Sequence, residues 1–261
     1  MKINLKDKKA LIGGSSKGLG YAVAKQLAVC GAMVTLVSRN ESLLKKNMIE
    51  LKKLTGFDHN YIAVDYNDSE GYNKIITGFF KTNSVDILIN NTQGPSAGDV
   101  LSVSESDYKN AFNLLFQNTV NTSMAAIKGM KKNNWGRIIN MASVSVKEPL
   151  SYLALSNTIR SAVTSWGKTL SIESGKHNIT VNNILTGFFN TERLNQLNSE
   201  KAKKFNVSTE EVFDKMSEMV PLKRIGEPEE FGYLVAFLSS EYADYINGTN
   251  IPIDGGLLKS M

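Results

Sequence analysis

The sequence predicts an α/β protein built on a doubly wound parallel sheet with helices on both faces. Short apolar runs alternate with longer amphipathic stretches along the chain, a pattern typical of strand–helix–strand units. A glycine-rich turn separates the first apolar run from the first amphipathic stretch, where such sheets bind a nucleotide. The length of 261 residues and the hydrophobic content of 42% suit a single domain over residues 1–261.

The individual elements follow from the same alternation. Strands are expected at the short apolar runs, which are Lys9–Gly13, Met33–Val37, Tyr61–Val64, Asp86–Ile89, Arg137–Met141 and Val181–Leu185. Helices are expected at the amphipathic stretches, roughly Gly18–Cys30, Glu41–Leu54, Ser69–Phe80, Ser106–Met130 and Ser151–Ser174. Right-handed crossovers between parallel strands then place helices on both faces of the sheet.

The stretch 190–220 breaks this rhythm. It is polar and helix-prone, and it follows the sixth expected strand at the edge of the sheet where ligands bind. We expect a substrate lid here, lined by the apolar side chains Phe188, Phe189, Met216 and Met219. A surface insertion whose apolar residues pack onto the core is the alternative.

The overall composition restricts the class of protein. The formal net charge is +5, but no basic stretch is interleaved with aromatic residues, so we expect no nucleic-acid partner. No apolar run is long enough for a membrane span or a signal peptide, and Cys30 is the only cysteine. These features favour a cytoplasmic protein with no membrane partner.

The glycine-rich turn predicts a dinucleotide site. Glycines permit a tight turn and the close approach of a pyrophosphate, while the helix N-terminus supplies free N–H groups and partial positive charge. Strand, turn and helix are all present at the required spacing, which predicts a Rossmann-type fold. The expected cofactor contacts within the turn are Gly14, Ser16, Lys17, Gly18, Leu19 and Gly20.

The end of the second strand predicts which dinucleotide binds. An acidic residue there would accept hydrogen bonds from the ribose 2′-hydroxyl of NAD, but the chain has Ser38 followed by Arg39. Arg39 can form charge-assisted hydrogen bonds with a 2′-phosphate, and Lys17 can add a second cation. We therefore expect NADP(H). The alternative is that both residues are ordinary solvent-exposed cations.

Several further motifs occur in a specific order. After the glycine turn come Asp65, Asn90–Gly94, Ser143, Thr186–Thr191, Pro221–Arg224, Glu227–Glu230 and Asp254–Gly256. In their joint order and spacing, from about Leu5 to Leu257, the chain resembles the short-chain dehydrogenase/reductase family. It is similar in particular to the 3-oxoacyl-acyl-carrier-protein reductase group.

The resemblance implies roles for three more residues and an assembly. Asp65 would contact the adenine, Asn91 would line the cofactor cleft, and Thr191 would lie near the nicotinamide carboxamide or the phosphates. Turn-capping is the alternative role of Asp65 and Asn91. The family also assembles through its long helices and C-terminal tail, which implies a homotetramer or a homodimer.

The catalytic positions depart from the family pattern. Ser143 matches the family's serine, but the tyrosine position 13 residues later holds Ser156, and the lysine position four residues further holds Arg160. The family's asparagine position on the preceding long helix falls on Leu115. The segment Ser156–Arg160 resembles a divergent branch with a Ser-Asn-Xaa-Xaa-Arg pattern.

The residues that remain can perform part of the chemistry. Arg160 lies four residues after Ser156, so both face the same side of a helix, and Arg160 can bind ribose hydroxyls as a permanent cation. Ser143 and Ser156 can together polarise a carbonyl oxygen.

Three routes remain open for the proton. Tyr152 would lie one turn before Ser156 if the helix starts early, either as an acid or as a wall of the substrate site. Lys147 is a second candidate, with a salt bridge as its alternative role, and water relayed through Ser156 is the third route. His59 and His177 are expected at the surface, and no residues have metal-ligand spacing.

Two functions are consistent with this pattern. The first is an NADP(H)-dependent oxidoreductase that reduces a carbonyl, or oxidises the alcohol, of a small or acyl-chain substrate, with 3-oxoacyl thioesters among the candidates. Ser143, Ser156, Arg160 and Tyr152 are its expected catalytic residues. The second is a non-catalytic NADP(H)-binding sensor or scaffold on the same fold, because the usual tyrosine, lysine and asparagine are all replaced.

Overall fold

Seven parallel strands form one sheet in the order β3-β2-β1-β4-β5-β6-β7. The structure is a computed structural model, and it describes residues 2–260. The strands are β1 (Lys9–Gly13), β2 (Met33–Ser38), β3 (Asn60–Ala63), β4 (Ile87–Asn90), β5 (Gly136–Met141), β6 (Ile179–Thr186) and β7 (Asn250–Ile253). The six expected strands are confirmed to within two residues, and the alternation in the sequence did not reveal β7.

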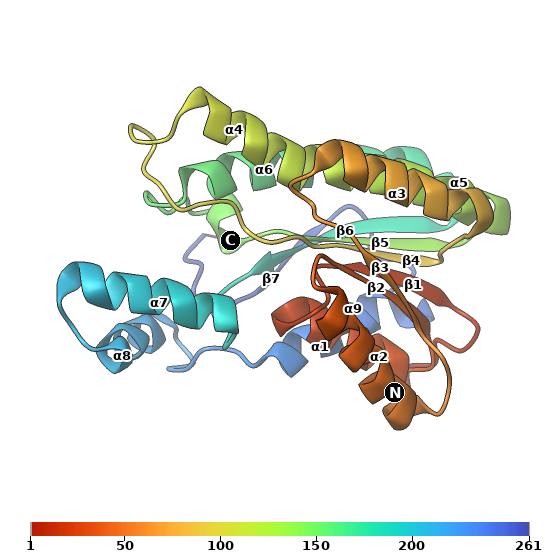
Figure 1. Ribbon diagram of the computed structural model, residues 1–261, viewed down its shortest axis with the longest axis horizontal. Coiled ribbons are helices and arrows are strands. Elements are labelled where there is room, and N and C mark those ends of the chain that lie inside the picture. The colour runs from red at the N-terminus through yellow and green to blue at the C-terminus, as the bar shows by residue number, and fades with distance from the viewer. Residues whose placement is uncertain (1, 261) are drawn as a thin grey trace.

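The helices cover both faces of the sheet, which confirms the doubly wound fold (Figure 1). One face carries α1 (Gly18–Val29), α2 (Glu41–Thr55) and α9 (Pro228–Leu238). The other carries α3 (Ser69–Thr82), α4 (Glu105–Phe112), α5 (Asn118–Asn133) and α6 (Ala154–Ser174). A π-helical turn, Asn113–Gln117, joins α4 to α5, so the single long helix expected here contains an irregular turn. No helix among residues 2–260 is long and apolar enough to cross a membrane.

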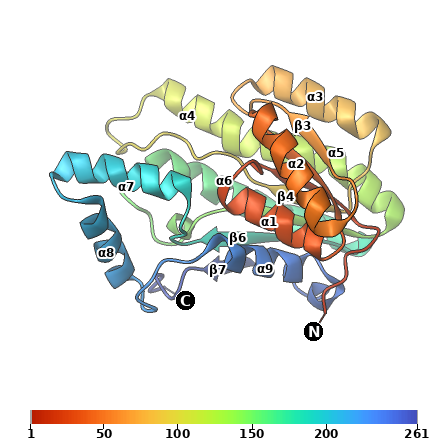
Figure 2. The ribbon, with the colours of Figure 1, turned by 60° about the horizontal axis from the view of Figure 1, so that its bottom comes forward.

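Two apolar layers hold the sheet between these helices. Central parallel strands are buried on both faces, which is why their sequences are almost continuously apolar. On α1, residues Val23, Ala24, Leu27 and Ala28 recur at helical spacing and are buried. They belong to the same apolar cluster as Phe231 and Val235 of α9, so α1 and α9 pack together against one face (Figure 2).

A ladder of four hydrogen-bonded asparagine side chains crosses the strands β4 to β7. The Asn90 amide donates to Asn140 Oδ1, Asn140 donates to Asn183 Oδ1, and Asn183 donates to Asn250 Oδ1, each over 2.8 Å. The four residues are direct neighbours in the registers of β4, β5, β6 and β7. Gly167 of α6 packs over this ladder, since a Cβ there would lie 2.8 Å from both Asn140 and Asn183.

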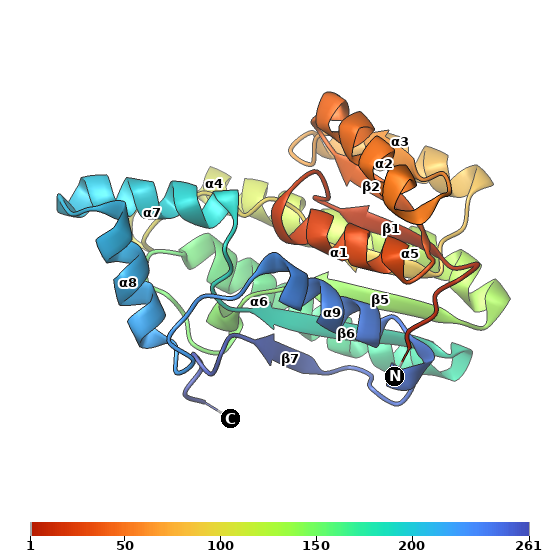
Figure 3. The same cartoon turned by 90° about the horizontal axis from the view of Figure 1, so that it is seen from below.

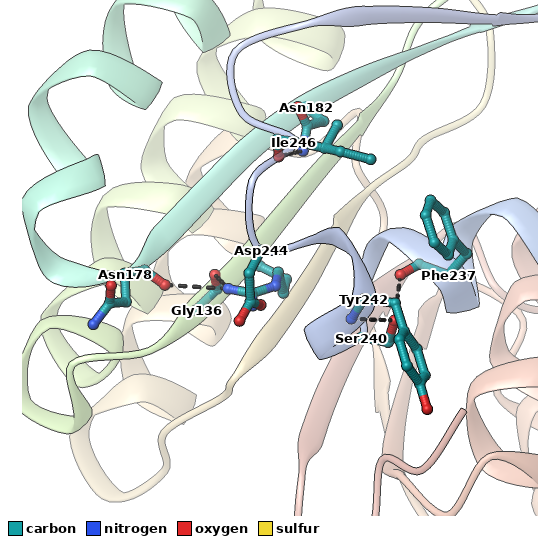
Figure 4. Close-up of polar contacts among 9 residues, drawn as sticks. Gly136, Asn178, Asn182, Phe237, Ser240, Tyr242, Asp244 and Ile246 are labelled. Atoms are coloured by element: carbon teal, nitrogen blue, oxygen red, sulfur yellow. Dashed lines mark hydrogen bonds and ion pairs between the residues drawn. The ribbon is translucent and has the colours of Figure 1, made fainter. Parts of the chain in front are cut away.

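The amino end of the sheet contains a buried cation that is paired with a carboxylate. Arg137 is 2% exposed, and its Nη1 donates to the carbonyl oxygens of Gly136 (2.8 Å) and Asn178 (3.1 Å). Its Nη2 forms an ion pair with Asp244, and Figure 4 shows Asp244 beside Gly136 and Asn178. His59 is also buried near this end, so the expectation that it lies at the surface is wrong.

The stretch 190–220 folds into two helices at the carboxyl edge of the sheet. They are α7 (Glu192–Phe205) and α8 (Thr209–Met219), and they project together from one end of the molecule (Figure 3). A small apolar cluster around Ala202 and Met216, with Phe188 packed against it, joins the two helices. Phe189 instead packs on Phe231 of α9, and Met219 is exposed, so neither residue belongs to the apolar cluster that Phe188 joins.

Candidate active site

The glycine turn lies at the carboxyl end of β1 with the backbone that a pyrophosphate requires. Gly14 and Gly18 have left-handed φ angles of 54° and 57°, which residues with a Cβ rarely adopt. A Cβ on Gly20 would lie 2.2 Å from the carbonyl oxygen of Gly14. Leu19 packs toward the apolar core and anchors the first turn of α1. These residues therefore fit a dinucleotide diphosphate at the N-terminus of α1.

Side chains from three other elements hold this turn in place. Asn91, after β4, donates to the carbonyl oxygens of Gly13 (3.1 Å) and Gly14 (3.4 Å). Asn47 of α2 donates to the carbonyl of Ser16 over 2.8 Å. Tyr66 is buried beneath the turn, and burial raises the pKa of its phenol well above the ordinary value. Sequence reasoning missed Asn47 and Tyr66, because a polar residue on a helix or a tyrosine after a strand carries no motif.

The end of β2 lies directly against the glycine turn. The Ser38 hydroxyl donates to Ser16 Oγ over 2.9 Å, which places these two expected cofactor contacts next to each other. Arg39 is exposed at this edge and forms no ion pair with a described residue. Lys17 is instead paired with Glu192 of α7 over 2.7 Å.

Asp65 lies in the turn that follows β3, and Thr191 lies at the start of α7. Asp65 Oδ1 accepts hydrogen bonds from the backbone N–H (2.9 Å) and the side chain (3.0 Å) of Asn67, so it closes a turn after β3. Thr191 caps α7 by accepting from the N–H of Leu194 over 3.2 Å, and its methyl group faces the space above Gly18. Both residues lie at the carboxyl edge of the sheet, where the cofactor contacts are expected.

Ser143 and Ser156 present free hydroxyl protons. Ser143 Oγ accepts from the N–H of Ser145 over 3.1 Å, and Ser156 Oγ accepts from Nε of Arg160 over 3.2 Å. Neither hydroxyl donates a hydrogen bond to a described residue, so each hydroxyl proton is available to a further acceptor. The structure confirms that Arg160 and Ser156 share one face of α6.

Arg160 is a desolvated cation without a carboxylate partner. Its Nη1 donates to the carbonyl oxygen of Met141, two residues before Ser143. None of the ion pairs among the described residues includes Arg160. Burial lowers its pKa to about 10, so the guanidinium remains charged at neutral pH. Beside it lies a cavity of about 10 Å³, room for a single water, with Leu115 and Thr119 in its wall.

Tyr152 does not occupy the position that an early helix start would give it. Helix α6 begins at Ala154, so Tyr152 lies in the preceding turn and not on the face of Ser156. Its hydroxyl instead accepts a hydrogen bond from Nζ of Lys201 on α7 over 3.2 Å. Lys147 is exposed and forms no ion pair with a described residue. Within residues 2–260, no three His, Cys, Asp or Glu residues meet as a metal site would require.

Known proteins are similar in sequence over almost the whole chain. A family model described as enoyl-(acyl carrier protein) reductase matches residues 14–258. The NADPH-dependent reductase BacG of Bacillus subtilis is 32% identical over 257 residues, which cover 97% of this chain and 98% of that protein. The 3-oxoacyl-(acyl-carrier-protein) reductase FabG of Aquifex aeolicus is 28% identical over 98% of this chain and 100% of its own.

Solved structures agree with the sequences. L-sorbose reductase from Gluconobacter frateurii, complexed with NADPH and L-sorbose, superposes with a TM-score of 0.94 at 30% identity, with both chains covered completely. YwfH, an NADPH-dependent reductase involved in bacilysin biosynthesis, superposes with a TM-score of 0.91 at 29% identity over 97% of this chain and 99% of its own. With its glycine turn, its strand order and these matches, the chain belongs to the short-chain dehydrogenase/reductase family.

Proposed function

We propose that this protein is an NADP(H)-dependent oxidoreductase that reduces a carbonyl group, or oxidises the corresponding alcohol, of a small or acyl-chain substrate. The observation that carries the proposal is the pairing of Ser156 with the desolvated, unpaired Arg160 beside an intact glycine turn. BacG, FabG and L-sorbose reductase are all reductases, which supports the proposal.

The proposed cofactor contacts combine the glycine turn with the residues that the family resemblance implies. Gly14, Gly18, Leu19 and Gly20 form the cradle for the diphosphate, with Asn91 holding its backbone. Ser16, Lys17, Ser38 and Arg39 face the 2′-phosphate, Asp65 faces the adenine, and Thr191 lies on the nicotinamide side. Arg160 binds the ribose hydroxyls of the nicotinamide half. When bound, the reduced nicotinamide supplies the hydride.

The residues of the chain then manage the charge on the substrate oxygen. Ser143 and Ser156 donate hydrogen bonds to the carbonyl oxygen, and the Arg160 cation stabilises the negative charge that develops there. Ser156 passes its proton to the alkoxide and is reprotonated by solvent water, while Nε of Arg160 stabilises the serine oxygen as that proton leaves. Tyr152, which lies off the face of α6, is a wall of the substrate site.

The lid, the assembly and the location complete the proposal. Helices α7 and α8, within residues 190–220, close over the substrate, and subunits associate as a homotetramer or homodimer. Light scattering of the purified protein tests the assembly, because a monomer at micromolar concentration contradicts it. A cytoplasmic location stays a prediction from the sequence.

The decisive experiment measures NADPH consumption with a panel of ketones, diketones, sugars and acetoacetyl thioesters, with NADH in parallel. Turnover that falls in the Ser143→Ala and Arg160→Met variants supports the proposal. Tight NADPH binding without turnover of any panel member would instead favour the non-catalytic sensor. Loss of the preference for NADPH over NADH in Arg39→Ala is expected, and a retained preference contradicts the role of Arg39.

A further inference from the structure

Helix α7 brings a lysine onto a tyrosine that lies 49 residues away in the chain. Nζ of Lys201 lies 3.2 Å from the Tyr152 hydroxyl oxygen and 4.4 Å from the centre of the Tyr152 ring. Lys201 is partly buried in this position. The contact therefore connects α7 to the turn before α6, across the side of the cleft where the substrate must lie.

No carboxylate neutralises Lys201. None of the ion pairs among the described residues includes it. Two acids on the surrounding elements are engaged elsewhere: Glu192 with Lys17, and Glu148 with the backbone N–H groups of Lys259 and Ser260. Glu200, the residue before Lys201, is exposed and accepts from Gln196. A partly buried ammonium that has only a phenol for a partner is suited to an anion.

A second polar group on α7 also lacks a partner. Asn198 is 0% exposed, and neither its amide nitrogen nor its amide oxygen has a hydrogen-bond partner. Buried amides are normally hydrogen-bonded, so this group requires an explanation. Asn198 lies three residues before Lys201, and residues at this spacing are neighbours on a helix surface. The buried face of α7 therefore presents an amide and an ammonium side by side.

The turn that carries Tyr152 is held rigidly close to the reacting group. The N–H of Gly98 donates to the Tyr152 carbonyl (2.9 Å), and the N–H of Ala154 donates to the Gly98 carbonyl (3.1 Å). Tyr152 precedes Ser156 by four residues, so their Cα atoms are at most about 14 Å apart even along an extended chain. One small molecule can therefore contact Ser156 with its carbonyl and the Tyr152–Lys201 pair with its other end.

We propose that Tyr152, Asn198 and Lys201 form a carboxylate-binding subsite, and that the substrate is a carbonyl compound that also carries a carboxylate. An ammonium, a phenol O–H and an amide N–H are all donors, whereas a carboxylate accepts only, so the groups are complementary. Binding would place the carboxylate between α7 and the Tyr152 turn, and it would give the buried Asn198 amide its partner. This inference rests on the proposed carbonyl reduction at Ser143 and Ser156.

The test compares acids with matched neutral ketones. The probes are 2-oxobutanoate, 4-oxopentanoate and 5-oxohexanoate, each beside its methyl ester, with NADPH as reductant. The variants are Lys201→Met, which removes the charge, Lys201→Arg, which keeps it, and Tyr152→Phe, which removes only the hydroxyl. Lys203→Met is the matched control, because Lys203 is an exposed lysine on the same helix. Calorimetry of acid binding to the protein saturated with NADP⁺ provides a readout independent of turnover.

The expected result is a preference of the native enzyme for at least one acid over its ester. In Lys201→Met, the ratio of kcat/KM for that acid to kcat/KM for its ester falls at least tenfold, mostly through KM. Lys201→Arg keeps most of the native acid-to-ester ratio, and Lys203→Met keeps all of it.

Two other outcomes overturn one proposal without the other. Turnover of esters, or of uncharged sugars, with no preference for acids and no response to Lys201→Met overturns the carboxylate subsite and leaves carbonyl reduction standing. Calorimetric binding of an acid that is lost in Lys201→Met, without turnover of any probe, supports the subsite and overturns the proposed reaction.

Discussion

Two arginines, Arg137 buried and Arg160 partly buried, lie at opposite ends of the same sheet, and their surroundings differ. At the amino end, Arg137 has a carboxylate and two carbonyl oxygens as partners. At the carboxyl end, Arg160 has one carbonyl and one hydroxyl but no carboxylate. The charge of the first cation is balanced by Asp244 without a ligand, and Arg137 belongs to the scaffold. The second retains uncompensated charge, which is what a site for an anionic cofactor and a developing alkoxide requires.

The largest expected effect comes from removing the incomplete cation. Arg160→Met should lower kcat/KM for carbonyl reduction by about 100-fold to 1,000-fold, since one electrostatic donor at the reacting oxygen is lost. The free energy of unfolding without cofactor should not fall, because no ion pair is broken and a desolvated charge is removed. Activity assays and urea denaturation measure the two quantities. Arg160→Lys, which keeps the charge, is the control, and full activity in Arg160→Met would remove Arg160 from the mechanism.

The reverse is expected at the amino end of the sheet. Arg137→Met should lower the free energy of unfolding by about 2–3 kcal/mol, because buried hydrogen bonds from a charged donor are lost. NADPH affinity measured by fluorescence titration should stay within twofold of the native value. If Arg137→Met has the same urea midpoint of unfolding as the native protein, Arg137 does not stabilise the scaffold.

A smaller effect concerns the contact between α7 and the glycine turn. Under the proposed cofactor contacts, Glu192 would compete with a cofactor phosphate for Lys17, so Glu192→Gln should tighten NADPH binding. The pair is exposed, so the gain is at most about 1 kcal/mol, or about fivefold in Kd. Glu200→Gln is the matched control, because Glu200 is an exposed acid on the same helix that does not contact Lys17. Weaker binding in Glu192→Gln would show that the ion pair aids the closed form of α7.

The smallest expected effect is the pH dependence of the scaffold. His59 accepts from the N–H of Val34 over 3.3 Å, and burial lowers the pKa of its imidazole below the unfolded value of about 6.5. The neutral form is favoured in the folded state, so its contribution is present above pH 6.5 and is lost as the pH falls. Urea midpoints at pH 7.5 and 5.5 should differ less for His59→Asn than for the native protein. An equal difference would exclude His59 as a source of the pH dependence.

The sequence predicted those parts of the molecule that depend on local pattern. The six strands follow from apolar runs, and the glycine turn from backbone angles that only glycine adopts readily. The pairing of Ser156 with Arg160 was accessible because four residues span one helical turn. The Tyr152–Lys201 contact was not accessible, because it depends on how α7 folds back across the cleft. That Arg160 has no carboxylate partner among the described residues likewise depends on how separate elements pack, so no local pattern predicts it.

The asparagine ladder has a consequence for the placement of the reacting groups. Each amide hydrogen-bonds to the asparagine directly opposite it on the neighbouring strand, so sliding any of the strands β4 to β7 by one residue would break that strand's links in the ladder. Met141, whose carbonyl holds Arg160, follows Asn140 directly in the chain. The asparagine side chains therefore help to set the register of the strands that end at the candidate active site. A one-residue insertion in β5 would shift the Met141 carbonyl, the acceptor of Arg160, even if the sheet still formed.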